Sequence, residues 1–205
     1  MLAEGFAANS IEQAALQVGF PVGPLVLNDE VSLELGRHVR AEIKKALEAE
    51  GKAYTATPAD TVIDKMCVEL NRKGRAAGGG FYDYPEGGKK NLWPGLKEHF
   101  QRADGGVPSP HQFQDLKDRL LYIQSIETIR CLEEKVLRSV ADANIGSIMG
   151  IGAPPWTGGL LQFVNYVGLP EFVRRSEELA IKYGERFTPP KLLREMAASG
   201  KTFTK

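Results

Sequence analysis

One turn-and-helix pattern occurs twice in this chain, and this repetition constrains the fold more than any other feature of the sequence. Gly19–Leu25 is a turn rich in glycine and proline that opens an apolar run, and Gly152–Leu160 is a second one. Each turn is followed by a helical stretch and then by a Thr-Pro pair, at residues 57–58 and 188–189. Each half ends in a glycine-spaced basic segment that leads to a phenylalanine. Four features in the same order predict two diverged copies of one helical unit, which make their own interface.

The spacing of apolar residues predicts an all-α chain. In Leu33–Ala49 an apolar side chain recurs every four residues, which is the spacing of one helix face. Pro24 suits the first turn of a helix, where a missing N–H costs nothing, and Thr57 can cap the helix that Pro58 opens. The other predicted helices cover residues 11–18, 58–70, 113–141, 160–164, 169–183 and 190–196, with extended pieces only at Phe81–Tyr84 and Phe203.

Glycine and proline are most frequent between residues 85 and 111. These residue types interrupt regular structure, so the segment predicts a junction between the two units. We expect a first helical domain over residues 1–90, a linker over 91–112 and a second, diverged copy over 113–205.

Composition argues against several classes of protein. Lysine and arginine number 26, as do aspartate and glutamate, and so balanced a chain has no overall field that attracts nucleic acid or an anionic membrane. No apolar run reaches the roughly 18 residues of a membrane span, and the N-terminus lacks the basic and apolar regions of a signal peptide. Cys67 and Cys131 lie in apolar helical stretches and are predicted to be small, reduced core residues, which fits a cytoplasmic protein.

The sequence contains no self-contained catalytic or metal-binding set. None of the three histidines lies within four residues of another or beside a cysteine, so no zinc spacing exists. The glycines of Gly146–Gly152 stand in the wrong order for a dinucleotide fingerprint and follow a helix rather than a strand. We therefore expect no catalytic, cofactor-binding or metal-binding residue in this chain.

Two polar features allow both a functional and a structural interpretation. Arg72 and Lys73, beside the glycines of residues 74–80, could hold a phosphate. A helix C-terminus repels anions, however, so compensation of the helix dipole is the favoured interpretation. Asp29 and Glu30 follow the first turn and are either a polar feature of a cleft or solvated helix-terminus residues, of which the second is favoured.

Both turns resemble segments of one enzyme family. Gly19–Leu25 resembles the Gly-x-Pro-x-Gly-Pro turn of the 3-hydroxyacyl-CoA dehydrogenases, and Gly74-Arg75 followed by Gly80–Tyr84 resembles the family's Gly-Arg and Gly-Phe-Tyr-x-Tyr segment. Ile151–Gly159 and Tyr183–Pro190 are similar to stretches of the multifunctional fatty-acid oxidation α-subunit, in which the helical dehydrogenase domain occurs twice. The resemblance covers nearly all of the 205 residues.

The resemblance implies a two-part enzyme of fatty-acid β-oxidation. In this family a Rossmann domain binds NAD and carries a catalytic His–Glu pair, whereas the helical domain closes the acyl-CoA site and mediates dimerisation. The two helical copies then imitate that dimer, as a pseudo-dimer within one chain. By the same resemblance Pro21, Gly23, Pro24 and Leu27 shape the acyl cleft and are the candidate substrate-binding residues.

The sequence departs from the family pattern where the chemistry should be. It has no dinucleotide fingerprint and no His followed by the family's Asn-Pro segment, and the family's opening Asn-Arg pair, expected just before Met1, is also absent. We expect the C-terminal, substrate-side and assembly part of an NAD-dependent 3-hydroxyacyl-CoA dehydrogenase, which is inactive without an upstream Rossmann domain or its equivalent. The alternative is a stand-alone assembly module that binds a separately encoded Rossmann partner. We also expect self-association over an apolar groove left by a shortened first helix.

Overall fold

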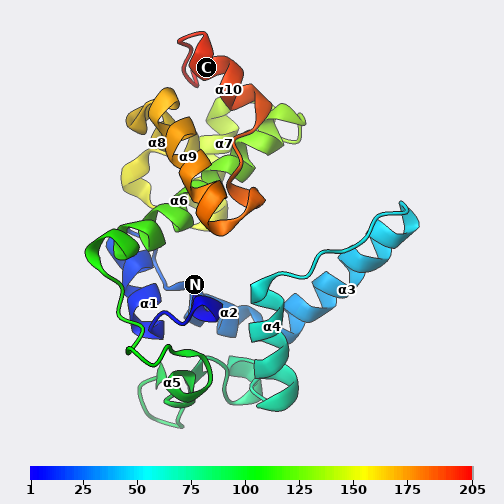
Figure 1. Cartoon of the computed structure of the whole chain (residues 1–205), viewed down its shortest axis with the longest axis vertical. Helices are drawn as coiled ribbons and strands as arrows, with labels where there is room; N and C mark the ends of the chain where they lie inside the picture. The colour runs from blue at the N-terminus through cyan, green and yellow to red at the C-terminus, as the bar shows by residue number, and fades with distance from the viewer. Residues whose placement is uncertain (205) are drawn as a thin grey trace. The chain divides into compact units, whose positions relative to one another are not determined.

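A computed structural model describes residues 1–204 and is mostly helical, which confirms the all-α prediction (Figure 1). Contacts within the chain divide it into two compact units. The first unit consists of Met1–Ala14 and Val22–Pro110, and the second consists of Ala15–Pro21 and the described residues from His111 onward.

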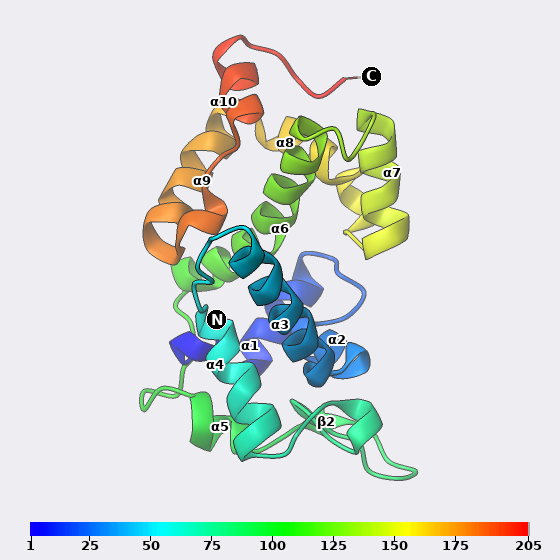
Figure 2. The same ribbon diagram turned by 90° about the vertical axis from the view of Figure 1, so that its right-hand side faces the viewer.

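The first unit is built from short helices and a two-stranded ribbon (Figure 2). Its α-helices are α1 (Ala8–Gln17), whose last three residues belong to the second unit, α2 (Pro24–Val31), α3 (Leu33–Ala49), α4 (Pro58–Asp64) and α5 (Gly95–Phe100). A π-helical turn, η2 (Lys65–Glu69), continues α4, and two 3-10 turns are η1 (Leu2–Glu4) and η3 (Arg75–Ala77). Strand β1 (Tyr82–Asp83) pairs antiparallel with β2 (Asn91–Leu92).

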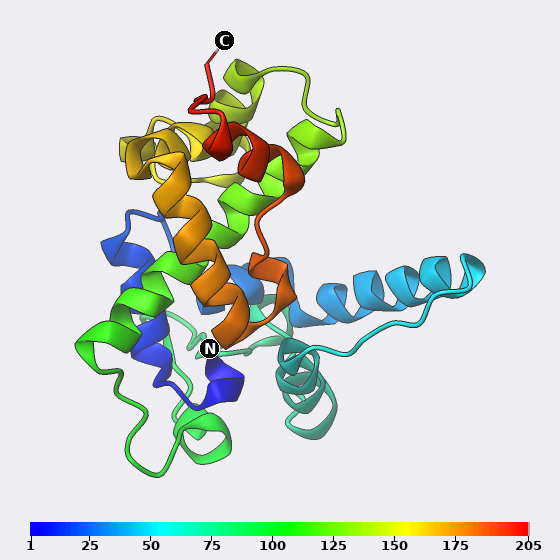
Figure 3. The same cartoon turned by 45° about the horizontal axis from the view of Figure 1, so that its top comes forward.

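Helix α3 extends away from the other helices of its unit (Figure 3). Its predicted apolar stripe faces outward, with Leu35, Val39 and Ile43 each about half exposed. The opposite side of the helix is polar, and Arg37 and Arg40 both pair with Asp64 of α4. Charge pairs rather than the apolar stripe therefore connect α3 to α4.

The start of α4 confirms the cap predicted from Thr57-Pro58. The Thr57 hydroxyl accepts a hydrogen bond from the Asp60 N–H, and the Asp60 carboxylate accepts one from the Thr57 N–H at 2.7 Å. This reciprocal arrangement satisfies two backbone donors that have no partner inside the helix.

The second unit packs its helices around an aromatic core. The elements are α6 (Pro110–Glu133), α7 (Val140–Ile151), η4 (Pro155–Thr157), α8 (Leu160–Val167), α9 (Leu169–Tyr183), η5 (Glu185–Phe187) and α10 (Lys191–Ala198). The Tyr122 and Phe172 rings stack with their centroids 4.1 Å apart, and Phe163 meets both edge-on. Both cysteines are free thiols, and Cys67 of the first unit is buried as predicted, whereas Cys131 is only partly buried.

The predicted helix over residues 113–141 is wrong at its C-terminal end. Helix α6 ends at Glu133, Lys135 adopts a left-handed φ of 61°, and α7 begins at Val140. The apolar period conceals the N-cap at Ser139, whose hydroxyl accepts a hydrogen bond from the Asp142 N–H at 3.0 Å.

Both units place an eight-residue helix before a sharp break in the backbone. The residue after α2 is Ser32, with φ 85° and ψ 125°, and the residue after α8 is Gly168, with φ 86° and ψ 127°. The next residue, Leu33 or Leu169, is buried and begins a long helix. Glycine adopts this conformation freely, whereas any other residue there is strained by about 1–3 kcal/mol.

Replacing Ser32 by glycine should therefore stabilise the protein. The relieved strain exceeds the extra entropy that glycine gives to the unfolded chain, so we expect the free energy of unfolding to rise by about 0.5–1 kcal/mol in urea denaturation. The reciprocal variant Gly168→Ser should lower it by about 1–2 kcal/mol through strain alone, because a Cβ at Gly168 meets no atom within 4 Å. Effects of the opposite sign would contradict this account.

Candidate functional site

The four residues predicted to contact an acyl group are divided between the two units. Pro21 belongs to the segment Ala15–Pro21 of the second unit, whereas Gly23, Pro24 and Leu27 belong to the first. Gly23 is the N-cap of α2 and Pro24 is its first residue, as the sequence predicts. Leu27 lies on the same helix with 50% of its surface exposed.

The segment that contains Pro21 is fixed to the second turn of the repeated pattern. The Trp156 indole N–H donates a hydrogen bond to the Val18 carbonyl at 2.6 Å. The Trp156 ring and Pro154 lie so close to Gly19 that a Cβ there would be 3.0 Å from the ring, and the φ of Gly19 is +94°. Glycine at this position is therefore required by both conformation and space.

The start of α2 is held by Glu12, a residue that sequence reasoning missed. Glu12 lies on α1 and is only 4% exposed. Its Oε1 accepts a hydrogen bond from the Leu25 N–H at 2.6 Å, and its Oε2 accepts one from the Tyr82 hydroxyl at 2.8 Å. A carboxylate at this end of a helix satisfies an amide with no intrahelical partner. The available signal was an acid on the buried face of α1, beside Ile11 and Ala15.

Glu12 also explains the second glycine of the turn. A Cβ at Gly23 would lie 2.1 Å from Glu12 Oε2, although the Gly23 backbone has an ordinary extended conformation. Glycine is thus required at this position by the close approach of the carboxylate and not by the backbone angles.

The interpretation of Asp29 as a solvated helix-terminus residue is wrong. Asp29 is 1% exposed, and its Oδ1 accepts a hydrogen bond from the Phe81 N–H at 2.8 Å. Its Oδ2 accepts bonds from the Tyr82 N–H at 2.8 Å and the Tyr84 hydroxyl at 3.0 Å. A Cβ at Gly80 would lie 2.0 Å from Asp29 Oδ1, so glycine there allows the loop to approach the carboxylate. Asp29 therefore joins α2 to β1.

The cations beside the glycine-rich segment also bind parts of their own unit. Arg72 donates to the Gly80 carbonyl at 2.6 Å and to the Tyr82 carbonyl at 2.9 Å, and its guanidinium lies 4.4 Å from the centre of the Trp93 ring. Lys73 pairs with Glu34 of α3 at 3.0 Å. Sequence reasoning weighed a phosphate site against dipole compensation and did not predict this role in holding the loop.

Glu30 differs from its neighbour Asp29. Its carboxylate pairs with Arg75 at 2.8 Å on the surface. Glu30 and Arg75 line a hollow of about 470 Å³ together with Tyr84 and Lys90.

The second unit makes two comparable contacts with neutral side chains. Asn144 of α7 accepts a hydrogen bond from the Leu161 N–H at 3.1 Å. Asn165 of α8 accepts from the Phe203 N–H at 2.9 Å and donates to the Phe203 carbonyl at 2.8 Å. Leu161 is the second residue of its helix and Asn165 the sixth, which are the positions that bear the corresponding contacts in α2.

Burial and hydrogen bonding shift the pKa of four groups in the first unit. Burial raises the pKa of Glu12 and of Asp29, and the hydrogen bonds from the Leu25 and Phe81 amides oppose this rise. Burial also raises the pKa of the Tyr82 and Tyr84 hydroxyls well above the ordinary phenol value, and the neighbouring carboxylates add to the effect.

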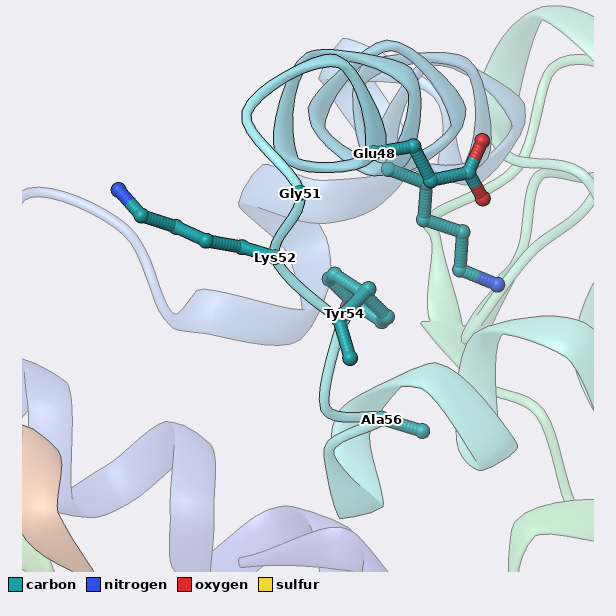
Figure 4. A pocket seen from close by; sticks show the side chains of 7 residues that line it. Glu48, Gly51, Lys52, Tyr54 and Ala56 are labelled. Carbon is teal, nitrogen blue, oxygen red and sulfur yellow. The ribbon is translucent and has the colours of Figure 1, made fainter.

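A surface hollow near the end of α3 carries several charged residues (Figure 4). It has a volume of about 600 Å³ and is lined by residues that include Lys44, Lys52 and Tyr54. Lys44 Nζ lies 5.1 Å from the centre of the Tyr54 ring, and Lys52 pairs with Glu50 at 2.7 Å while its side chain points away from Glu48 in Figure 4. The Lys52 charge is thus paired with a carboxylate, whereas the Lys44 ammonium lies against an aromatic ring.

Within residues 1–204, no group of three or more His, Cys, Asp or Glu side chains is arranged to hold a metal ion. Over the same residues, no helix combines the length and the apolar character needed to cross a bilayer.

Comparison with known proteins gives one consistent result. Residues 1–84 match the family described as 3-hydroxyacyl-CoA dehydrogenase, C-terminal domain. The chain is 37% identical over 204 residues to the fatty acid oxidation complex subunit alpha of Shewanella amazonensis. This match covers 99% of the chain but only 28% of the relative.

Two solved structures share the fold. The 3-hydroxybutyryl-CoA dehydrogenase from Escherichia coli K12 matches with a TM-score of 0.63 at 20% identity, over 97% of this chain and 57% of that one. The dehydrogenase part of multifunctional enzyme 1 from C. elegans matches with a TM-score of 0.56 at 15% identity, over 95% of this chain and 43% of that one.

Adding a methyl group at Gly23 should destabilise the protein because it displaces the Glu12 carboxylate from the Leu25 amide. We expect Gly23→Ala to lower the free energy of unfolding by about 2–3 kcal/mol. In a Glu12→Ala background the same change should be nearly neutral, which gives a coupling of about 2 kcal/mol in a double-mutant cycle measured by denaturation. Gly36→Ala on α3, where a Cβ meets open space, is the control and should cost nothing. Equal costs of Gly23→Ala in both backgrounds would show that Glu12 is not what requires the glycine.

Alkaline pH should destabilise the protein through the partly buried phenols of Tyr82 and Tyr84. An unfolded tyrosine loses its proton near pH 10, whereas Tyr82 and Tyr84 keep theirs in the folded state. The folded state then holds more protons, so stability falls as pH rises through the unfolded pKa. We expect Tyr84→Phe to reduce the slope of unfolding free energy between about pH 9.5 and 11, by at most about 1.4 kcal/mol per pH unit. A slope that the variant leaves unchanged would contradict the assignment.

Proposed function

Starting from a chain whose residues 1–84 belong to the 3-hydroxyacyl-CoA dehydrogenase C-terminal domain family, we propose that it is the substrate-side and assembly part of an NAD-dependent 3-hydroxyacyl-CoA dehydrogenase of fatty-acid β-oxidation. The observation that carries the proposal is the 37% identity to a fatty acid oxidation complex subunit alpha, which extends over 99% of the chain. A relationship of that extent includes both helical units.

The proposal assigns NAD binding and the catalytic pair to a Rossmann domain outside this chain. The chain spans 28% of the length of its relative, which leaves room for such a domain. Gly146 and Gly150 lie on helix α7 and not on a strand-to-helix turn, so the glycine-rich run lacks the form of a dinucleotide-binding loop. The partners of the chain are then that domain and the acyl-CoA substrate, and the two free thiols fit a cytoplasmic location.

In the proposed enzyme Pro21, Gly23, Pro24 and Leu27 shape the acyl cleft. The contact of Glu12 with the start of α2 supports this role, because its carboxylate binds the Leu25 amide directly after Pro24 and lies close to Gly23 directly before it. A turn held in this way keeps the half-exposed Leu27 in one position on α2. An aliphatic side chain on a rigid support is suited to contact with an acyl chain.

We also propose that the two halves are diverged copies of one unit, with domains over residues 1–90 and 113–205, a linker over 91–112 and a pseudo-dimeric arrangement. Three correspondences support common ancestry: a helix of eight residues, an acceptor for the amide of its second residue, and a polar side chain at its sixth residue that binds a distant phenylalanine. The matching backbone angles of Ser32 and Gly168 are a fourth.

The purified 205-residue chain should not oxidise 3-hydroxybutyryl-CoA with NAD. We expect activity to appear when the Rossmann part of a related dehydrogenase is added in trans, and NADH absorbance measures it. Turnover by the chain alone would overturn the assignment of chemistry to another domain. Failure to bind or activate any Rossmann domain, supplied separately or fused before Met1, would overturn the assembly role.

Leu27→Asp tests the substrate contact in the reconstituted enzyme. We expect the ratio kcat/KM to fall at least about tenfold, because a carboxylate cannot pack against an acyl chain. Val68→Asp is the matched control, since Val68 is 63% exposed and is assigned no contact with substrate. Equal activity of the two variants would remove Leu27 from the cleft.

A further inference from the structure

The outer face of α3 is an apolar surface that the proposed function does not use. Leu35, Val39 and Ile43 recur at four-residue spacing, so they lie along one side of the helix, and they are 47%, 51% and 47% exposed. The opposite side of the helix is occupied by ion pairs with α4. Single exposed apolar side chains are common on protein surfaces, but a continuous row on a helix that extends from its unit is typical of an interaction site (Figure 3).

The corresponding helix of the second unit shows what kind of group covers such a face. Helix α9, like α3, begins at a buried leucine directly after the break in the backbone. Counted from that leucine, Gly36 of α3 corresponds to Phe172, which stacks on Tyr122 of α6. Val39 corresponds in the same way to Arg175, which pairs with two aspartates of α6. This side of α9 is therefore packed against a helix, and a helix is the occupant that fits the outer face of α3.

The polar residues beside the apolar row are complementary to a second copy of themselves. Each of Glu34, His38 and Glu42 directly precedes a member of the row, and Lys45 continues this edge. An antiparallel pair of α3 helices centred near Val39 sets His38 opposite Glu42 of the other copy. It sets Glu34 opposite Lys45 in the same way. A parallel pair in register would instead place each of these residues beside its own copy, and like charges in contact are unfavourable.

The partners that these charges have within one copy do not block the pairing. Glu42 and Lys45 bind each other at 2.7 Å, but their side chains remain 71% and 70% exposed. Glu34 pairs with Lys73 at 3.0 Å, and both side chains are 37% exposed. Exposed ion pairs contribute little to stability, so sharing these groups with a second helix costs little.

We propose that α3 is the interface between two copies of this chain, paired antiparallel through the apolar row. Leu35 of each copy packs against Ile43 of the other, and the two Val39 side chains meet at the two-fold axis. A contact of one surface with itself closes after two copies, so the product is a dimer. This assigns a surface to the self-association that the sequence predicts. The inference is independent of the dehydrogenase assignment, because it uses α3 alone and none of the residues of the proposed acyl cleft.

Sedimentation equilibrium of the whole chain tests the proposal. We expect a reversible monomer–dimer equilibrium with a dissociation constant of about 10–100 μM, since one pair of helices buries less than a standard interface of about 1,600 Å². Val39→Asp should weaken the dimer at least about tenfold, because two carboxylates then meet at the axis. Ile181→Asp on α9 is the matched control, since Ile181 is 87% exposed and lies outside the interface. A chain that stays monomeric well above that concentration, or equal losses in the two variants, would overturn the proposal.

Charge reversal tests the antiparallel register. Glu42→Lys should weaken the dimer about three- to tenfold, because the two symmetric contacts with His38 are lost. Adding His38→Glu should recover most of the lost affinity, since it restores both contacts with the charges exchanged. Both variants carry the new lysine beside Lys45, so their difference isolates the contact with the other copy. Failure of the second substitution to restore affinity would contradict the assigned register.

Disulfide cross-linking distinguishes the two orientations. Cys131 is partly buried and is replaced by serine in this experiment, whereas Cys67 is buried and stays. Val39→Cys should cross-link rapidly under mild oxidation, because the two copies of this position meet within the separation that a disulfide requires. Leu35→Cys should not, because its two copies lie about 12 Å apart along the axes of an antiparallel pair. Equal cross-linking of both variants, or cross-linking of Leu35→Cys alone, would overturn the antiparallel dimer.

Discussion

A helix of eight residues has most of its backbone amides and carbonyls near its ends, so it depends on groups from other parts of the chain. Helix α2 receives such a group from Glu12, and through Asp29 it supplies one to Phe81, Tyr82 and Tyr84. The two carboxylates also share Tyr82, whose amide binds Asp29 and whose hydroxyl binds Glu12. The turn before α2 and the glycine-rich segment before β1 are therefore parts of one buried network, on which the geometry of the proposed acyl-contact residues depends.

The second unit meets the same structural need without charge. Asn144 and Asn165 occupy the roles of Glu12 and Asp29, and no ionisable partner is needed to bind two backbone groups of Phe203. An amide avoids the free energy of burying a carboxylate, which is considerable even with several donors nearby. The first unit thus uses ionisable side chains for these contacts and the second uses neutral ones. The ionisable side chains lie next to the turn for which we propose contact with substrate.

The sequence predicted helix bounds and caps correctly where neighbouring residues determine the local structure. Pro24 begins α2, Thr57 caps α4, and the apolar period of residues 169–183 is a helix with these bounds. The sequence did not predict the burial or partner of a side chain where that partner is distant along the chain. Asp29 and Glu30 are adjacent and chemically alike, but Asp29 is buried by a loop 52 residues away while Glu30 pairs on the surface. The end of α6 was missed because apolar residues continue at helical spacing through a turn that Lys135 and Ser139 define.

Residue-resolved amide hydrogen exchange tests the central claim that equivalent side-chain acceptors hold the helices and loops together within each unit. The amides of Phe81 and Phe203 lie outside the helices and would exchange rapidly if exposed. The account predicts that both are protected to within about tenfold of the helical amides of Leu25 and Leu161, since all four donate to side-chain oxygens inside their own unit. Rapid exchange at Phe81 or Phe203, at the rate of an unprotected loop, would contradict it.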